Sequence, residues 1–222
     1  MSITASGNDL TVDGTIDASG NLTLITQTAL GGDIITTGQT VGADNDITMT
    51  SADLINAGAI NSTGAGGAVV LTAGNEITIG TASDIDGTLT MTSSGAAANG
   101  IITLTGALTM ENDVTATGDE VDVDGNITVD VGSVTLTAGN DVDVDANITA
   151  TVGSVAIAAN SASAGAGADV IVGAAGNTIT ASNDITLTGD DVTAGDLATT
   201  ATGALTITAT NDISMLGDFD GD

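Results

Sequence analysis

Residues 118–138 of the chain are followed directly by a near copy of themselves, residues 139–159. The two segments are offset by 21 positions, and 13 of the 21 residues are identical. A repeat of this length indicates a supersecondary unit that cannot bury its apolar face alone and becomes stable when neighbouring units stack on it. The repeat therefore predicts a solenoid or a related stacked architecture.

Within each copy, apolar and polar residues alternate in three short bursts. In the first copy the bursts begin at Val121, Ile127 and Val134, and Asp-Gly-Asn and Val-Gly-Ser turns separate them. Alternation with a period of two is typical of strands that bury one face, and no helical spacing fits these residues. Each unit is therefore expected to form three strands, one on each side of a three-sided coil.

Similar bursts recur from Leu10 to Met215. We expect an all-β fold: a right-handed parallel β-helix, which is a three-sided β-solenoid, with about ten coils of roughly 19–25 residues. Residues 1–216 form a single solenoid domain in this interpretation, and residues 217–222 form an acidic C-terminal tail. At ~4.8 Å per stacked strand, the rod would be roughly 45–50 Å long.

The formal charge is −29, and the chain contains no Lys, Arg or His. Nucleic acid is therefore excluded as a partner, because phosphate binding depends on Lys and Arg. No apolar run approaches the ~18 residues of a membrane span, so no membrane insertion is expected. High net charge and biased composition also occur in disordered chains. Here the alternation continues along the whole chain, which favours a folded solenoid.

Four segments carry a family resemblance: Asn-Asp-Ile-Thr-Met (45–49), Gly-Asn-Glu-Ile-Thr-Ile (74–79), Gly-Ser-Val-Thr-Leu (132–136) and Asn-Asp-Ile-Thr-Leu (183–187). They resemble repeats of bacterial filamentous-haemagglutinin-like adhesins, and the resemblance covers nearly all of the chain. It implies a secreted surface protein whose shaft is a right-handed parallel β-helix. The secretion domain of that family carries Asn-Pro-Asn signatures, and this chain has no Pro. The resemblance therefore implies the shaft.

Carboxylates in the twin units form a candidate metal site. Asp122 and Asp143 each lie between Val residues that face inward, so both should face outward, one coil apart. Asp124 and Asp145 occupy the adjoining corner. Stacking in register would hold like carboxylates roughly 5 Å apart, and calcium prefers such oxygen clusters. The alternative is a solvated acidic face that salt screens.

The last residues, Leu216 to Asp222, resemble the start of an Asp-x-Asp-Gly-Asp calcium loop of the dockerin or integrin-repeat type. Asp218 and Asp220 would be its ligands, although the segment ends before such a loop could close. Calcium is the one cofactor that these patterns suggest.

Thr-x-Thr pairs recur throughout the chain, for example Thr48/Thr50 and Thr186/Thr188. Such pairs on one flat face could order water and bind ice or a glycan. The simpler interpretation is that Thr is an outward-facing β-former. We expect the pairs to change faces between coils, which favours the simpler interpretation. At the turn of the twin units, Asn126 and Asn147 are expected to stack as an amide ladder.

Catalysis is not expected. The chain has no His, Lys, Arg or Tyr for acid–base work, and its acidic residues are spread along the rod. The expected function is structural: an extracellular, surface-associated shaft or fibre subunit. The coil pattern begins near Met1 and continues to Met215, so a head-to-tail homopolymer is one explanation and excision from a longer shaft is the other. The alternative function is a binding module for ice or glycan that uses a repetitive Thr/Asp face.

Overall fold

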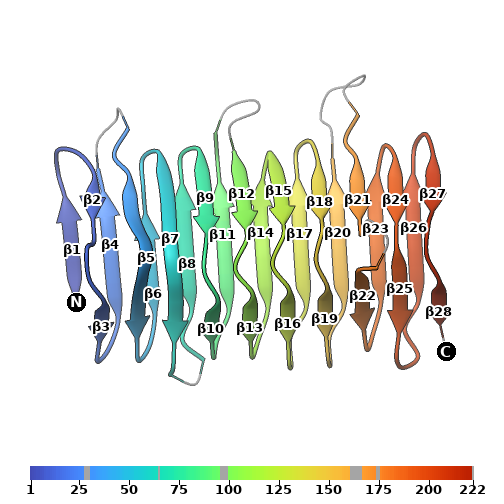
Figure 1. Cartoon of the computed structure of the whole chain (residues 1–222), viewed down its shortest axis with the longest axis horizontal. Helices are drawn as coiled ribbons and strands as arrows, with labels where there is room; N and C mark the ends of the chain where they lie inside the picture. Colours follow the sequence, from blue (N-terminus) through green and yellow to red (C-terminus); the bar gives the residue numbers. More distant parts are fainter. Residues whose placement is uncertain (28–30, 65, 96–99, 161–166, 174–175, 222) are drawn as a thin grey trace.

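The computed structural model describes residues 1–221 except 28–30, 65, 96–99, 161–166 and 174–175. The described part of the chain contains strands and turns and no helix. All strand pairs are parallel, and the strands lie side by side along one axis with the two termini at opposite ends (Figure 1). The prediction of an all-β solenoid with about ten coils is confirmed.

Each coil passes through three faces. Face 1 is a ten-stranded sheet. Its strands are β1 (Ser2–Ala5), β4 (Leu22–Thr26), β6 (Ile47–Thr50), β8 (Val69–Ala73), β11 (Leu89–Ser93), β14 (Val114–Gly118), β17 (Val134–Ala138), β20 (Val155–Ala159), β23 (Ile185–Gly189) and β26 (Leu205–Ala209).

Faces 2 and 3 together form an 18-stranded sheet. Face 2 contains β2 (Leu10–Thr11), β9 (Glu76–Ile79), β12 (Ile101–Leu104), β15 (Glu120–Val123), β18 (Val142–Val144), β21 (Val170–Val172), β24 (Val192–Ala194) and β27 (Ile213–Met215). Face 3 contains β3 (Ile16–Ala18), β10 (Ser83–Ile85), β13 (Leu108–Met110), β16 (Ile127–Val129), β19 (Ile148–Ala150), β22 (Thr178–Ala181), β25 (Asp196–Thr199) and β28 (Phe219–Gly221).

Two long strands join faces 2 and 3 without a break: β5 (Ile34–Ala43) and β7 (Leu54–Ser62). The first half of β5 pairs with β2 and the second half with β3. An irregularity between Thr36 and Thr40 interrupts the pairing of β5 with β7. A bulge of this kind lets a strand bend sharply, which explains how one strand serves two faces.

The core is one apolar column that runs through the coils, and its members are almost completely buried. In face 1 the buried residues alternate with half-buried ones, as in Leu22 and Leu24 of β4. Aliphatic side chains and methionines from the three faces fill the interior. The alternation in the sequence therefore determines which side of every strand faces the core.

The twin units stack in register, as predicted: Val121 pairs with Val142, and Ile127 pairs with Ile148. Coil length is less regular than predicted. Ile157 pairs with Leu187, so the coil between them has 30 residues. The longer coil leaves the strand register unchanged, since these two residues still pair.

Glycine at a corner lets one coil lie directly on the next. A Cβ built at Gly153 would lie 1.9 Å from the carbonyl oxygen of Gly132, the matching residue of the preceding coil. The Val-Gly-Ser turn of the repeat therefore requires glycine for close approach of the backbone.

The segment set apart as a tail contributes a strand. Phe219–Gly221 forms β28, in which Phe219 pairs with Leu197 and Asp220 with Ala198. The solenoid pattern therefore continues through Gly221.

Candidate functional surfaces

The structure brings Asp122 and Asp143 together. They are direct partners in the pairing of β15 with β18, and both side chains are half-buried between buried Val residues. One carboxylate oxygen of Asp143, Oδ1, is buried and has no hydrogen-bond partner among the described residues. Two like charges are thus held on adjacent strands, and the chain has no basic side chain to neutralise them.

Burial raises the pKa of Asp122, and the charges of Asp124 and then Asp143 raise it further. Burial likewise raises the pKa of Asp143, with the charge of Asp145 as the next cause. Asp124 and Asp145 lie exposed in the adjoining corner, as the sequence predicts. Their backbone N–H groups donate to Leu104 O and Val123 O, each at 2.9 Å. The pKa values of Asp122 and Asp143 rise because the charged form of each loses hydration and lies near like charges.

The other two predicted calcium ligands lie elsewhere. Asp218 precedes β28 and Asp220 lies in it, at the opposite end of the chain from the N-terminus and away from β15 and β18 (Figure 1). The backbone N–H of Asp218 donates to Asp196 Oδ1 at 2.8 Å. Among the described residues, no group of three or more His, Cys, Asp or Glu side chains has an arrangement suited to a metal ion. The structure therefore joins four of the six candidates as neighbours in adjacent coils and leaves two apart.

Asn126 and Asn147 occupy equivalent turn positions, as predicted, but the hydrogen bonds are not the expected side-chain ladder. The backbone N–H of Asn147 donates to Asn126 Oδ1 at 3.1 Å. The backbone N–H of Thr178 donates to Asn147 Oδ1 at 2.7 Å. Each amide oxygen thus accepts a backbone N–H of the next coil, from Asn147 just before β19 and from Thr178 at the start of β22.

A second acidic column was missed in the sequence. Asp141, Asp169, Asp191 and Asp212 each precede the first apolar residue of a face 2 strand. The backbone N–H of Asp169 donates to Asp141 Oδ1 at 2.9 Å, and that of Asp212 donates to Asp191 Oδ1 at 2.9 Å. Burial raises the pKa of Asp169, followed by the charges of Asp191 and Asp141. The recurrent Asp before Val or Ile was the available signal, and it indicates a side chain that binds the backbone of the following coil.

The prediction that Thr-x-Thr pairs change faces holds for a minority of them, such as Thr103/Thr105, which lies at β12 on face 2, and Thr178/Thr180, which lies in β22 on face 3; most of the pairs lie on face 1. The outward positions of face 1 form two columns along the sheet, and threonine dominates both. The first column contains seven threonines: Thr23, Thr48, Thr90, Thr115, Thr135, Thr186 and Thr206. The second contains eight: Thr4, Thr50, Thr72, Thr92, Thr117, Thr137, Thr188 and Thr208.

Only five of the twenty outward positions on face 1 are not threonine: Ser2, Ile25, Val70, Ala156 and Ala158. None of the twenty, all of which the structure describes, is acidic. The central outward columns of faces 2 and 3 differ. The face 2 column contains Asp122 and Asp143, and the face 3 column contains Asp17, Asp84 and Asp220. Threonine fills four of the ten positions in each of these columns: Thr11, Thr78, Thr103 and Thr193 on face 2, and Thr109, Thr128, Thr149 and Thr180 on face 3. The preference of strands for threonine therefore acts on all three faces, and face 1 differs in its larger share of threonine and its lack of acidic residues.

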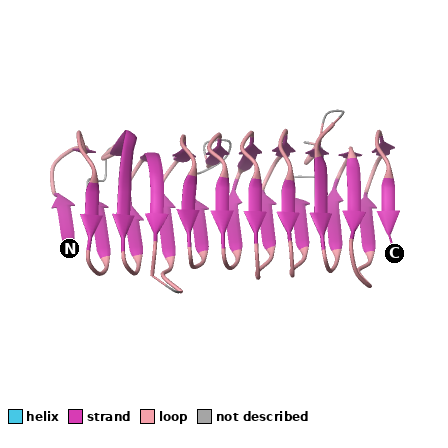
Figure 2. Ribbon diagram, turned by 60° about the horizontal axis from the view of Figure 1, so that its bottom comes forward, coloured by secondary structure: helices cyan, strands magenta, loops and turns pink. Residues whose placement is uncertain are grey.

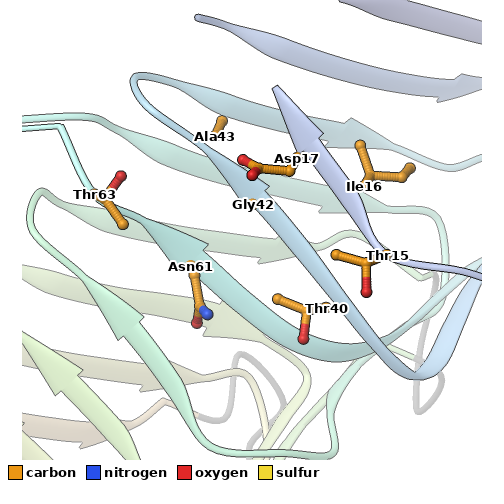
Figure 3. Close-up of a pocket in the computed structure, with 8 residues that line it drawn as sticks. All are labelled: Thr15, Ile16, Asp17, Thr40, Gly42, Ala43, Asn61 and Thr63. Atoms are coloured by element: carbon orange, nitrogen blue, oxygen red, sulfur yellow. The ribbon is translucent and has the colours of Figure 1, made fainter. Parts of the chain in front are cut away.

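A shallow hollow lies on face 3, across β3, β5 and β7. Its lining is drawn in Figure 3: Thr15, Ile16, Asp17, Thr40, Gly42, Ala43, Asn61 and Thr63. Asp17, Gly42 and Asn61 are consecutive partners in the outward column. The glycine has no side chain, so a gap is left between the carboxylate and the amide. The hollow therefore arises because Gly42 leaves a gap in the outward column, and it is not a cleft between structural elements.

A second hollow on face 3 is lined by acidic side chains, which include Asp84, Asp86, Glu111 and Asp130. Neither hollow contains a basic or imidazole group, since the chain has none.

No family model, curated protein or solved structure matches this chain. In the part of the chain that the structure describes, no helix is long and apolar enough to cross a membrane. Conclusions about function therefore rest on the geometry of the solenoid and on the chemistry of its faces.

Proposed function

We propose that this chain is a structural shaft: an extracellular, cell-surface β-solenoid that acts as a rod-like spacer or fibre subunit and has no enzymatic activity. One observation carries the proposal. A single apolar core runs without interruption through the ten coils, and every coil adds one parallel strand to each face. The length of such a rod is set by the number of coils, and its stiffness by the continuous sheets (Figure 2).

The chemistry of the chain agrees with this proposal. The two hollows described on face 3 are shallow and lie on the outward side of the sheet. A net charge of −29 favours solubility and keeps neighbouring rods apart. The resemblance of the repeats to filamentous-haemagglutinin-like adhesin shafts supports secretion to the cell surface.

Distance measurements between the ends test the proposal. The chain has no Cys, so dyes can be attached to a Thr4→Cys/Thr208→Cys variant. Single-molecule energy transfer should give one narrow distance of about 43 Å, from nine strand steps of ~4.8 Å. Deletion of residues 118–138, which is one whole coil, should shorten that distance by about 4.8 Å and preserve the fold.

Deletion of residues 118–127 is the control, because half a unit destroys the register and should abolish the rod. A broad distance distribution in the parent chain would contradict the shaft. So would loss of folding in the whole-coil deletion.

The threonine surface of face 1 supports a second candidate function, ice binding. Each threonine presents a hydroxyl that donates and accepts, next to a methyl group. The columns repeat at ~4.8 Å along the rod and at roughly 6.7 Å across the strand. Figures 1 and 2 show that the strands of face 1 keep one direction from end to end, so the threonine columns on this face form a regular array. A glycan partner is less well supported, because sugar rings commonly stack on aromatic side chains and the chain has one Phe and no Trp or Tyr.

Ice-crystal shaping by the purified chain tests this second function. Ice binding predicts faceted crystals, and a Thr117→Asp/Thr137→Asp variant should lose the effect because charge disrupts the array. Thr103→Asp on face 2 is the matched control and should retain it. Round crystals with the parent chain, or equal effects of both variants, would exclude ice binding through face 1.

A further inference from the structure

Gly42 occupies an outward position of face 3 for which the backbone does not require glycine. Its φ angle lies outside the left-handed region. A Cβ built there would lie 3.6 Å from Ile16 O, 3.7 Å from Asn61 O and 3.8 Å from Asp17 Oδ1, which are ordinary van der Waals contacts. The glycine also pairs regularly with β3 and β7, so it lies outside the irregularity of β5. Space and conformation would therefore both accept a side chain at this position.

This glycine is also an exception within its column. The other nine positions of the central outward column of face 3 all carry a side chain. Glycine inside a strand weakens the strand, and it often marks a place where a ligand approaches the backbone closely. The hollow over Gly42 is therefore the place on face 3 where a ligand would explain a feature that the fold leaves unexplained.

Polar side chains from three adjacent strands surround this hollow. Asp17 of β3 and Asn61 of β7 lie on either side of the glycine (Figure 3). Thr15 and Thr40 line one end of the hollow, and Thr63 lines the other. The volume is about 220 Å³, which is below the roughly 300–1,000 Å³ of sites for drug-sized ligands. A ligand of this size is a single small ring.

The two flanking side chains offer opposite hydrogen-bonding groups. Asn61 Oδ1 accepts the backbone N–H of Asp84 at 3.3 Å, so the amide nitrogen is the group left for a ligand. Among the described residues, neither the Asp17 carboxylate nor Asn61 Nδ2 has a hydrogen-bond partner. A carboxylate accepts and an amide nitrogen donates, whereas the threonine hydroxyls do both. The hollow thus needs a donor on one side and an acceptor on the other.

These groups select the chemical class of the ligand. An anion is opposed by Asp17 and by the net charge of −29. An ammonium or guanidinium group donates only, so it would pair with Asp17 and leave Asn61 Nδ2 without an acceptor. A hydroxyl donates and accepts, and a neutral ring with several hydroxyls therefore satisfies both side chains at once.

We propose that this hollow binds one neutral sugar ring, which lies over Gly42, donates a hydroxyl to Asp17 and accepts from Asn61 Nδ2. The site goes beyond the shaft function and is separate from the threonine surface of face 1. The ring stays on the outward side of the sheet, so strand pairing is unaffected. No aromatic side chain lines the hollow, so binding rests on hydrogen bonds. A dissociation constant on the order of 1 mM is expected for a single ring.

An NMR titration of the whole ¹⁵N-labelled chain tests the site. The probes are glucose, galactose, mannose and N-acetylglucosamine, with methylammonium and acetate as the cationic and anionic controls. At least one sugar should shift the backbone amide signals of Asp17, Gly42 and Asn61 in a saturable manner. The two charged probes should not produce saturable shifts at these residues.

Filling the hollow separates ligand binding from stability. Gly42→Thr introduces a residue that strands favour, so the melting temperature should be equal or higher while the sugar-induced shifts are lost. Ala198→Thr, in the same outward column, is the matched control and should bind like the parent. Asp17→Asn should weaken binding about tenfold. Asp220→Asn removes an equal charge from the same column and should leave binding unchanged.

Three results would overturn the site. The first is the absence of saturable shifts with all of the sugars. The second is sugar binding that Gly42→Thr leaves unchanged. The third is a larger saturable shift with methylammonium than with any sugar, which would identify a cation site instead. The distance measurement between the ends decides separately whether the chain is a shaft.

Discussion

Face 1 and face 2 are built from the same kind of strand and differ in what they show to solvent. In β17 of face 1, buried Val134 and Leu136 alternate with the outward pair Thr135 and Thr137. In β18 of face 2, buried Val142 and Val144 flank the outward Asp143. The inward residues are interchangeable aliphatic side chains. The outward residues are neutral hydroxyls in β17 and a carboxylate with no basic partner in β18.

The comparison separates the residues that form the fold from those that give each face its chemistry. Inward positions are almost fully buried on both faces, so any polar group there loses hydration without gaining a partner. Outward positions accept both hydroxyl and carboxylate side chains. The excess of threonine at the outward positions of face 1 is therefore not explained by the requirements of the fold. The apolar core therefore supports the proposal of a rod, whereas the threonine surface bears on what the rod could bind.

The largest effect is expected when a carboxylate is placed at an inward position of face 2. Val144→Asp places an unpaired carboxylate in the core and should cost on the order of 4 kcal/mol or more. The adjacent Asp143→Val should leave stability equal or higher, because it removes a half-buried charge that lacks a hydrogen bond at Oδ1. Urea unfolding followed by circular dichroism measures both. Similar losses in the two variants would contradict the assignment of inward and outward sides.

A smaller loss is expected at the corners that join the faces. Gly153→Ala forces a methyl group against the carbonyl of Gly132 and should cost roughly 2 kcal/mol. Gly20→Ala is the matched control, since a Cβ there meets nothing within 4 Å, and its effect should stay within about 0.5 kcal/mol. Thermal unfolding distinguishes the two. Equal shifts in melting temperature would mean that the corners are less tightly stacked than the structure indicates.

Mild acid should stabilise the folded protein through Asp122 and Asp143 of face 2. The pKa values of Asp122 and Asp143 are raised in the folded state from the ordinary value of 3.8, so the folded protein binds these protons more tightly than the unfolded chain. The resulting stabilisation is complete below the unfolded pKa and is lost as the pH rises through the raised folded pKa. The unfolding free energy should therefore be higher at mildly acidic pH than at pH 7, by less than about 1 kcal/mol because solvent screens these groups.

Asp122→Asn/Asp143→Asn should remove this part of the pH dependence. An Asp13→Asn/Asp44→Asn variant changes the net charge equally at exposed positions and should retain it. A pH profile that is the same in both double variants would show that the general negative charge, and not this pair, is responsible.

The calcium hypothesis predicts the smallest effect. If calcium bridges the carboxylates of Asp122, Asp124, Asp143 and Asp145, chelation should lower the melting temperature of the chain. Calcium should then restore the original value more effectively than sodium at the same ionic strength. Equal restoration by both salts would reduce the acidic face to a charged surface that salt screens.

Much of the fold could be predicted from the sequence, because alternation and the 21-residue repeat report directly on core-facing strands and stacking. The pairing of Asp122 with Asp143 followed from that register. The threonine surface did not, since corners of unequal length place similar pairs at irregular intervals: the partners Ile157 and Leu187 are 30 residues apart, whereas Leu187 and Ile207 are 20 apart. The amide oxygens of Asn126 and Asn147 bind backbone N–H groups of the next coil, a detail that depends on corner geometry and not on composition.

The central claim is that successive coils stack in one register, so that outward side chains form columns belonging to single faces. A disulfide within one chain tests it most directly. Thr115 and Thr135 are direct partners on face 1, whereas Thr103 lies on face 2. A Thr115→Cys/Thr135→Cys variant should form an intramolecular disulfide rapidly in dilute monomer, detected by the loss of free thiol and by a raised melting temperature. The variant Thr103→Cys/Thr115→Cys should keep both thiols free; preferential closure of that second pair would contradict the account.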